Sequence, residues 1–416
     1  MEKRRVVVTG MGVVSPYGVG TDKFWDNIKA GKSGIGHPDL IDLDKHVVKI
    51  AGQAKGFNEL DYFSEKEAKK LDRYVEFALV AAEEAVKDSN IDFSKEDPYR
   101  AGSIVSTAAG GFKTFEDNHI RILERGTNKC SPFTVPMMIV NMASGNVSMK
   151  FGLKGICKAV VSACATGTHS IGDAFRSIQY NDADIMLAGG SEAVICDVGM
   201  GGFASARTLS KRNDEPEKAS RPYDKDRDGF VMGEGAGVLV LEEYEHAKAR
   251  GAKIYAEIVG YGQSADAYDI VAPDPEGNGA MKTMEFALKD ANIKPEDVDY
   301  INTHGTSTGL GDIAESMAIE KVFGDKEKNK NLCVSSTKSM HGHMLGATGA
   351  VESVVCIKAI NEGIVPPTIN LDNQDEHVAN LDYVPHVARE KNVDYALNNS
   401  FGFGGQNSTL IFKKIK

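Results

Sequence analysis

Residues 155–167 read GICKAVVSACATG, an apolar run that gives way at Cys164 to a cluster of small residues. The run over 155–161 is typical of a buried strand, and Ala, Gly, Ile and Phe then recur at helical spacing from 165 to about 180. Backbone N–H groups at a helix N-terminus favour a thiolate over a thiol and can also hold an oxyanion. The pattern therefore predicts a nucleophilic Cys164 with a lowered pKa, against the alternative of an inert buried thiol.

Two histidines lie in polar turns that follow apolar runs. His304 lies within NTHGTST, residues 302–308, and His343 ends STKSMHGH, residues 336–343. Catalytic groups concentrate in loops held by a rigid sheet, whereas a core histidine more often lies in a periodic apolar segment. A thiol with two histidines, and without a carboxylate paired to either of them in the sequence, is suited to forming an acyl-enzyme and stabilising an enolate.

Strand-like and helical segments alternate along the chain, which predicts parallel strands covered by helices. The expected strands are 6–9, 103–106, 156–161, 185–188, 255–261, 300–303 and 332–335. The expected helices are 22–31, 64–89, 165–180, 278–292, 311–323 and 346–362. The regions of Cys164 and Lys338 share the order strand, serine-containing turn and Gly/Ala-rich helix, which suggests a duplication. We place the boundary near residue 253, so that half 1–253 carries Cys164 and half 254–416 carries both histidines.

Composition excludes several classes of function. A net charge of −11 argues against nucleic acid or an anionic membrane as partner, because both require a broad basic face. Six widely spaced cysteines with no C-x-x-C pair argue against disulfides and structural zinc, and predict a reducing, cytoplasmic compartment. The N-terminal apolar run is interrupted by Gly10, Gly12 and Pro16, so no signal peptide is expected, and no apolar run is long enough to predict membrane insertion.

Three patterns imitate other sites. DKDRDG, residues 224–229, resembles the start of a calcium loop, but the twelfth position is Gly235 instead of a carboxylate. Gly10-Met11-Gly12 follows a strand like a dinucleotide loop, but the third glycine position holds Ser15. His341 and His343 could form a metal pair, yet no carboxylate or cysteine accompanies them at ligand spacing. We expect no metal, and we expect His341 to be a bystander.

Five motifs in order closely resemble the elongating β-ketoacyl-acyl carrier protein synthases, the synthase II type of condensing enzyme in type II fatty-acid synthesis. These motifs are VTGMGVVSP (8–16), the Cys164 segment, RPYD through GEGAG (221–237), the two histidine motifs, and NSFGFGG (399–405). The resemblance covers the whole chain. It implies an α/β, thiolase-like fold in which two similar halves pack as a five-layered αβαβα sandwich, with the catalytic groups between the halves. It also implies a homodimer in which residues 131–141 lie near the partner's site.

The activity that the resemblance implies is a decarboxylative Claisen condensation. Cys164 takes an acyl group from acyl carrier protein, malonyl-acyl carrier protein loses CO₂, and its carbanion attacks the acyl-enzyme to give 3-oxoacyl-acyl carrier protein. No cofactor is expected, because the phosphopantetheine arrives on the carrier.

The resemblance also assigns roles to single residues. His304 and His343 are expected to donate hydrogen bonds from Nε2 to the malonyl thioester oxygen, and the backbone N–H groups of Cys164 and Phe403 to form an oxyanion hole. Lys338 matches the family's active-site lysine. The acidic residues expected to organise this network are Glu352 and Asp312.

Other matches concern the substrate. Thr306 and Thr308 match hydroxyls that hold the phosphopantetheine arm, and residues 401–405 match a loop that gates the site. Ala109 stands where relatives often carry a bulkier aliphatic residue, which predicts a roomier acyl pocket, and Val271 stands where many place a threonine. The substrate-binding residues expected are Thr306, Thr308, Ala109, Phe203 and Phe401.

A lysine face is expected to dock the acidic acyl carrier protein. Lys66, Lys69 and Lys70 follow a Ser64/Glu67 capping box at i, i+3 and i+4, so they are expected to share one helix face. Such a face is usually only a solvated surface. Here it matches the family's docking patch, as do Lys129 and Arg207, whereas Asn128 replaces a basic residue of that patch.

Alternatives remain at this point. A ketosynthase of a type II polyketide or aryl-polyene pathway shares all these motifs. The non-enzymatic alternative is a chain-length factor, which lacks the nucleophile and is disfavoured by Cys164, His304 and His343. A thiolase requires a second catalytic cysteine near the C-terminus, where this chain has Gly402 to Gly405. A cysteine hydrolase needs one histidine base and leaves the second histidine motif unexplained.

Overall fold

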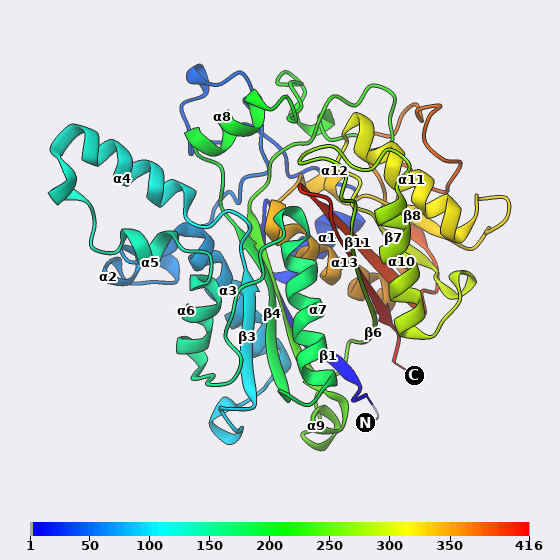
Figure 1. Ribbon diagram of the computed structural model, residues 1–416, viewed down its shortest axis with the longest axis horizontal. Coiled ribbons are helices and arrows are strands. Elements are labelled where there is room, and N and C mark those ends of the chain that lie inside the picture. The colour runs from blue at the N-terminus through cyan, green and yellow to red at the C-terminus, as the bar shows by residue number, and fades with distance from the viewer. Residues whose placement is uncertain (1–2, 416) are drawn as a thin grey trace.

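A computed structural model describes residues 3–415 of the chain (Figure 1). Ten strands form one sheet: nine follow the order β3-β4-β5-β1-β6-β12-β11-β7-β8, and β2 lies off this path, paired to β1. The strands of the N-terminal half are β1 (Val6–Ser15), β2 (Gly18–Val19), β3 (Ala101–Ser106), β4 (Ile185–Glu192) and β5 (Gly235–Glu243). Those of the C-terminal half are β6 (Ala256–Ala265), β7 (Tyr300–Asn302), β8 (Cys333–Ser335), β11 (Tyr395–Gly402) and β12 (Gln406–Lys413). The halves join where β1 pairs antiparallel with β6.

Helices form three layers around these strands. In the middle, α7 (Thr166–Gln179) and α13 (Thr348–Glu362) contact each other and strands of both halves. Outside the N-terminal strands lie α3 (Arg73–Ser89) and α6 (Met142–Phe151). Outside the C-terminal strands, α10 (Asn278–Ala291) packs on β6 and β12, and α11 (Gly309–Phe323) packs on α10. The expected thiolase-like fold is therefore confirmed. The expected parallel sheet is wrong, because β4–β5, β5–β1, β1–β6 and β6–β12 pair antiparallel, whereas β3–β4, β11–β7 and β7–β8 pair parallel.

The remaining elements are shorter or peripheral. The helices are α1 (Thr21–Lys29), α2 (Glu65–Ala68), α4 (Phe112–Arg125), α5 (Thr134–Met138), α8 (Asp197–Ser205), α9 (Tyr244–Ala249) and α12 (Lys338–His341). A separate pair of strands consists of β9 (Ile364–Val365) and β10 (Arg389–Glu390). Helices α4 and α5 lie to one side of the body, with α2 beside them (Figure 1). Among residues 3–415, none of the helices combines the length and the apolar character that a membrane span requires.

Glycines allow the two central helices to meet. A Cβ at Gly167 of α7 would lie 2.8 Å from the carbonyl oxygen of Gly346, and one at Gly349 of α13 would lie 1.9 Å from Thr168 Oγ1. Contacts this short leave no room for any side chain. The Gly/Ala-rich pattern of both helices is thus a packing requirement.

The two halves share one structural feature, a 3₁₀ turn at the start of α7 and of α13. A 3₁₀ turn precedes each helix, Ala163–Ala165 before α7 and Leu345–Ala347 before α13. The first residue of each turn has a positive φ, 49° at Ala163 and 47° at Leu345. The turn Leu345–Ala347 is therefore the counterpart of the Cys164 turn. The expectation that this counterpart lies at Lys338 is wrong, because α12 lies there, between β8 and α13.

The expected strand over 156–161 is wrong. Only one β-bridge forms there, between Cys157 and Ser103 of β3. Side-chain hydroxyls replace the rest of the ladder, since Val160 N–H donates to Ser106 Oγ and Ser144 Oγ donates to the carbonyl of Lys158. Ser and Thr hydroxyls compete with backbone partners in this way.

The expected helix over 64–89 is broken in two. The Ser64/Glu67 capping box is confirmed at the start of α2, which ends at Ala68. Asp72 then caps α3 by accepting the Tyr74 N–H at 3.2 Å, and it also accepts from Thr114. An aspartate that caps a new helix ends the first one. The other expected strands and helices are present, and the elements that were not expected include α4, α6, α8, β11 and β12.

The glycine contacts predict a contrast between two substitutions. Gly349→Ala should lower the free energy of unfolding by about 2 kcal/mol, because the added methyl overlaps Thr168. Gly201→Ala in α8 is the matched control, since a Cβ there meets nothing within 4 Å; it should leave stability unchanged or raise it by up to about 1 kcal/mol. Urea unfolding of both variants measures this, and equal effects would contradict the packing argument.

Candidate active site

Cys164 lies in the 3₁₀ turn directly before α7. The turn is held by a hydrogen bond from Ser162 N–H to Thr166 Oγ1, 2.9 Å long. Its first residue, Ala163, has the left-handed φ of 49° that a non-glycine residue adopts only where the surroundings enforce it. The turn leaves Cys164 8% exposed, facing a cavity between the halves.

His304 lies in the loop that follows β7. Glu315 of α11 holds this loop, because its carboxylate accepts the N–H of His304 at 2.8 Å and that of Gly305 at 2.7 Å. Glu315 is buried, and sequence analysis missed it because a glutamate in a helix resembles a solvated charge. Its pairing with the backbone fixes where the imidazole of His304 stands.

His343 lies between α12 and α13. Its N–H donates to the carbonyl of Val231 at 2.7 Å, and its own carbonyl accepts from Gly233 N–H at 2.8 Å. The ring nitrogen Nδ1 lies 3.0 Å from Thr348 Oγ1, a partner that sequence analysis also missed. Among residues 3–415, no carboxylate is hydrogen-bonded to the ring of either His304 or His343.

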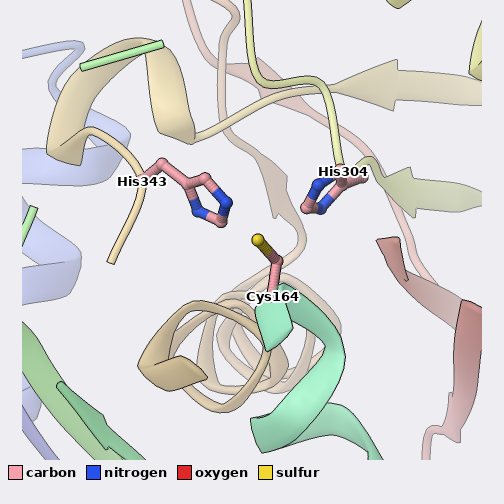
Figure 2. A group of neighbouring side chains, drawn as sticks. All are labelled: Cys164, His304 and His343. Atoms are coloured by element: carbon pink, nitrogen blue, oxygen red, sulfur yellow. The ribbon is translucent and has the colours of Figure 1, made fainter. Parts of the chain in front are cut away.

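The two rings flank the sulfur of Cys164 from opposite sides (Figure 2). Sγ and one ring nitrogen of each histidine all lie within 4.8 Å of one another. The ring centroids are 5.3 Å apart and nearly perpendicular, at 86°. The three residues singled out from separate motifs thus form one cluster.

Both histidines are neutral. Burial lowers the pKa of His304 and of His343 well below the usual value, and the nearby Lys338 ammonium lowers both further. Burial also leaves His343 Nε2 and His304 Nδ1 without a hydrogen-bond partner in the described chain. Neutral rings can donate one hydrogen bond to a developing anion and accept one proton.

Lys338 and Glu352 form a buried ion pair. Lys338 Nζ donates to Glu352 Oε1 at 2.6 Å and to the carbonyl of Thr303 at 3.4 Å. Burial raises the pKa of Glu352 to about 7, although Lys338 acts in the opposite direction. The Lys338 ammonium lies close enough to lower the pKa of Cys164, His304 and His343, and Glu352 holds it in place.

Asp312 has a different place from the one expected. Its carboxylate accepts the N–H of Tyr223 at 2.9 Å and that of Ser307 at 3.1 Å, and it pairs with Arg227 at 3.6 Å. Burial raises its pKa to about 6. It touches neither histidine nor Lys338, so it organises the 306–308 turn and acts on the cluster only indirectly.

A narrow cavity of about 110 Å³ connects the cluster to the surface at Val271. Ala109 is not among the residues that line this cavity; it packs against the apolar cluster that contains Cys164, as Phe203 does. Its N–H donates to the buried Glu192, which also accepts from Thr107, Ala108 and Gly346. The expected substrate residues that line the cavity are Thr306, Thr308, Phe203 and Phe401.

The expected lowered pKa of Cys164 is wrong. Burial raises the pKa of this thiol to about 12, against the lowering effects of Lys338 and of hydrogen bonds from the backbone N–H groups of Phe403 and Cys164. The backbone N–H groups of Phe403 and Cys164 both lie against Sγ, and their role as an oxyanion hole stays a prediction. A helix N-terminus stabilises a thiolate only in competition with desolvation, which wins here.

The three lysines expected to share a helix face do not lie on one helix. Lys66 is in α2, Lys69 follows its last residue and Lys70 lies in the linker to α3. They nevertheless line one groove, together with Arg121 and Phe133. The groove does not include Lys129 or Arg207, which are exposed elsewhere.

The raised pKa of Cys164 predicts how alkylation depends on pH. The rate constant for iodoacetamide should rise about tenfold per pH unit from pH 7 to pH 9.5, because only the thiolate reacts and its fraction grows tenfold per unit below the pKa. Peptide mass mapping follows Cys164, with the exposed Cys157 as accessibility control. A plateau for Cys164 below pH 9 would contradict the desolvation argument.

Comparison with known proteins matches both halves of the chain. The family model described as Beta-ketoacyl synthase, N-terminal domain, matches residues 3–247, and the C-terminal domain model matches residues 255–372. The 3-oxoacyl-[acyl-carrier-protein] synthase 2 of Vibrio cholerae is 49% identical over 416 residues, with 100% of both chains covered. The Staphylococcus aureus protein of the same name is 48% identical over 415 residues, covering 100% of this chain and 99% of its own.

A solved ketosynthase, in complex with the acyl-carrier protein of a type II PKS, has a TM-score of 0.92 and 37% identity and covers 100% of each chain. Sequence and backbone thus agree over the full length. The gathered cysteine and histidines lie between the two matched halves, and the chain belongs to the β-ketoacyl synthase family.

Proposed function

We propose that this chain condenses acyl-acyl carrier protein with malonyl-acyl carrier protein, giving 3-oxoacyl-acyl carrier protein and CO₂ in fatty-acid elongation. The observation that carries this proposal is the cluster itself: a buried thiol between two neutral histidines, with two backbone N–H groups on the sulfur. The relatives named 3-oxoacyl-[acyl-carrier-protein] synthase 2 support it at 48–49% identity over the full length.

Acyl transfer comes first. Cys164 Sγ attacks the thioester carbonyl, the new S–C bond forms, and the phosphopantetheine thiolate leaves and takes up the proton that Cys164 loses. The N–H groups of Cys164 and Phe403 hold the oxyanion, and one such donor contributes about 3–4 kcal/mol. Since burial keeps Cys164 in the thiol form, proton loss accompanies attack.

Condensation follows without a strong base. The malonyl carboxylate leaves as CO₂, and its bonding electrons form an enolate on the thioester oxygen. His304 and His343 donate hydrogen bonds to that oxygen, and the Lys338 charge adds to the field. The enolate carbon then attacks the acyl carbonyl, the S–C bond breaks, and Cys164 regains a proton.

The cavity accommodates the arm that carries both substrates. Thr306 Oγ1 and Thr308 Oγ1 lie 3.0 Å apart in its wall and can bond the phosphopantetheine amides. Val271 offers no hydroxyl where relatives place one. The 401–405 segment closes the β11–β12 hairpin, and positive φ values at Gly404 and Gly405 let it shift as a gate. The small Ala109 leaves the acyl end of the site roomier.

The lysine groove is the docking surface for the carrier. Lys66, Lys69 and Lys70 surround it with Arg121, and Lys70 Nζ lies 5.2 Å from the Phe133 ring. Four cations around an apolar floor suit an acidic helical partner. Lys129 and Arg207 lie outside the groove, and their part in docking the carrier stays a prediction.

A homodimer accounts for the apolar surface of α4 to α6. Large apolar side chains are exposed along 115–149, among them Phe115, Ile120, Leu123, Val135 and Met149. Leu123 is the most exposed of these five side chains, at 73%. A patch of this kind marks a protein interface. The interface includes the 131–141 segment, which then lies near the partner's site. A cytoplasmic location, the boundary near residue 253 and the absence of a cofactor or metal stay predictions.

Two alternative functions are less well supported. A polyketide ketosynthase shares the cluster, but the one compared is 37% identical and the elongation synthases reach 49%. A chain-length factor is disfavoured by the intact Cys164, His304 and His343.

Intact mass spectrometry tests the function directly. The protein with acyl and malonyl carrier should yield the 3-oxoacyl carrier, and acyl carrier alone should add the acyl mass to Cys164. Cys164→Ala should abolish both signals, because the nucleophile is gone. Acylation without condensation by the unmodified protein would overturn the proposal, and varying the acyl chain separates elongation from specialised use.

Charge reversal tests the docking surface. Lys66→Glu with Lys70→Glu should raise KM for the carrier about tenfold at low salt and leave kcat unchanged, because these side chains act only on encounter. The difference should shrink as salt screens the charges. Lys282→Glu with Lys289→Glu in α10, on the other side of the molecule, is the matched control (Figure 1). Equal KM values for both pairs would contradict this surface.

A further inference from the structure

We infer that Thr348 is a positioning residue that fixes the proton of the His343 ring on Nε2, the nitrogen that faces the reacting atoms. This inference rests on the proposed function and goes beyond it, since it names the group that makes His343 a donor.

The first observation is a buried hydroxyl with one partner. Thr348 is the first residue of α13 and is 1% exposed, and His343 is 2% exposed. Within residues 3–415, Thr348 Oγ1 has a single hydrogen-bond partner, His343 Nδ1 at 3.0 Å. A buried hydroxyl hydrogen needs an acceptor, and Nδ1 is the acceptor present. Thr348 therefore donates and Nδ1 accepts.

The second observation is the state of the ring. His343 is neutral, because burial and Lys338 lower its pKa well below the usual value. A neutral imidazole carries one N–H, so an acceptor Nδ1 places the hydrogen on Nε2. Nε2 is buried and has no hydrogen-bond partner in the part of the chain that the structure describes. Figure 2 shows a ring nitrogen of His343 directed to the gap between Cys164 and His304. This hydrogen is thus free for the substrate oxygen.

Other contacts hold the residue in place without Thr348. Two backbone hydrogen bonds, to Val231 and from Gly233, fix its main chain. The Phe230 ring packs edge-on against the imidazole with centroids 5.3 Å apart. Loss of the Thr348 hydroxyl therefore leaves the ring where it is and removes the control over which nitrogen carries the hydrogen.

The two histidines differ in whether a side-chain hydroxyl bonds the ring nitrogen Nδ1. His304 Nδ1 is buried and has no partner among the described residues 3–415, so no hydroxyl there selects its tautomer. The effect of Thr348 is confined to His343, and it concerns the enolate step instead of acylation of Cys164, where backbone N–H groups hold the oxyanion.

The test compares Thr348→Val, which keeps the shape, with Thr348→Ser, which restores the hydroxyl. Thr348→Val should lower kcat for malonyl decarboxylation and condensation about 10–100-fold. This is the range, about 10–100-fold, seen when a residue that orients a metal-ligating histidine is lost. KM and the acylation rate should stay within about twofold, and Thr348→Ser should recover most of kcat. Thr283→Val is the matched control, because Thr283 is a buried threonine whose Oγ1 has no partner.

A second readout does not depend on turnover. Histidine ¹⁵N spectra distinguish the two tautomers, and the His343 signals are assigned by their loss in His343→Ala. The unmodified protein should show Nε2–H, and Thr348→Val should show a mixture. Unchanged kcat in Thr348→Val, failure of Thr348→Ser to recover, or an Nδ1–H form in the unmodified protein would each overturn the inference. If no variant condenses but the spectra follow this order, the proposed function fails and the positioning role stands.

Discussion

The close approach of α7 and α13 is the constraint on which the site depends. Gly167 and Gly349 leave no space for a Cβ, so the two helices meet near their N-termini. Each helix begins after a 3₁₀ turn with a left-handed first residue. One turn carries Cys164 from the first half, and the other follows His343 in the second half. Cys164 and His343, which are far apart in the chain, become adjacent because the N-termini of α7 and α13 face each other.

Burial at this junction determines the chemistry. The same desolvation raises the pKa of Cys164 to about 12 and lowers that of both histidines. The resting site is then a thiol beside two neutral imidazoles, and the nearby Lys338 ammonium is paired to Glu352. Such a site lacks a strong base, and decarboxylation needs none, because CO₂ departure itself generates the carbanion. What the site must supply is donors for the enolate oxygen, and a fixed tautomer of His343 serves that need.

Much of the fold was predictable, and the failures have physical causes. Strong periodicity located α7, α10, α11 and α13 to within a few residues. The strand expected before Cys164 does not form, because Ser106 and Ser144 hydroxyls take over its backbone partners. The helix over 64–89 breaks because Asp72 caps a second helix. Side chains that bond the backbone act locally but depend on tertiary neighbours, so hydropathy alone does not reveal them.

The sequence by itself determined the nucleophile, both histidines and the family, because those motifs carry the chemistry in residue type and order. Only the tertiary structure decided the protonation states and the supporting residues. Glu315, Glu192 and Thr348 resemble ordinary helix or strand residues in the sequence, and the pKa of Cys164 followed burial instead of helix position. Desolvation and hydrogen bonding between distant segments exist only after the two halves pack together, so no local pattern encodes them.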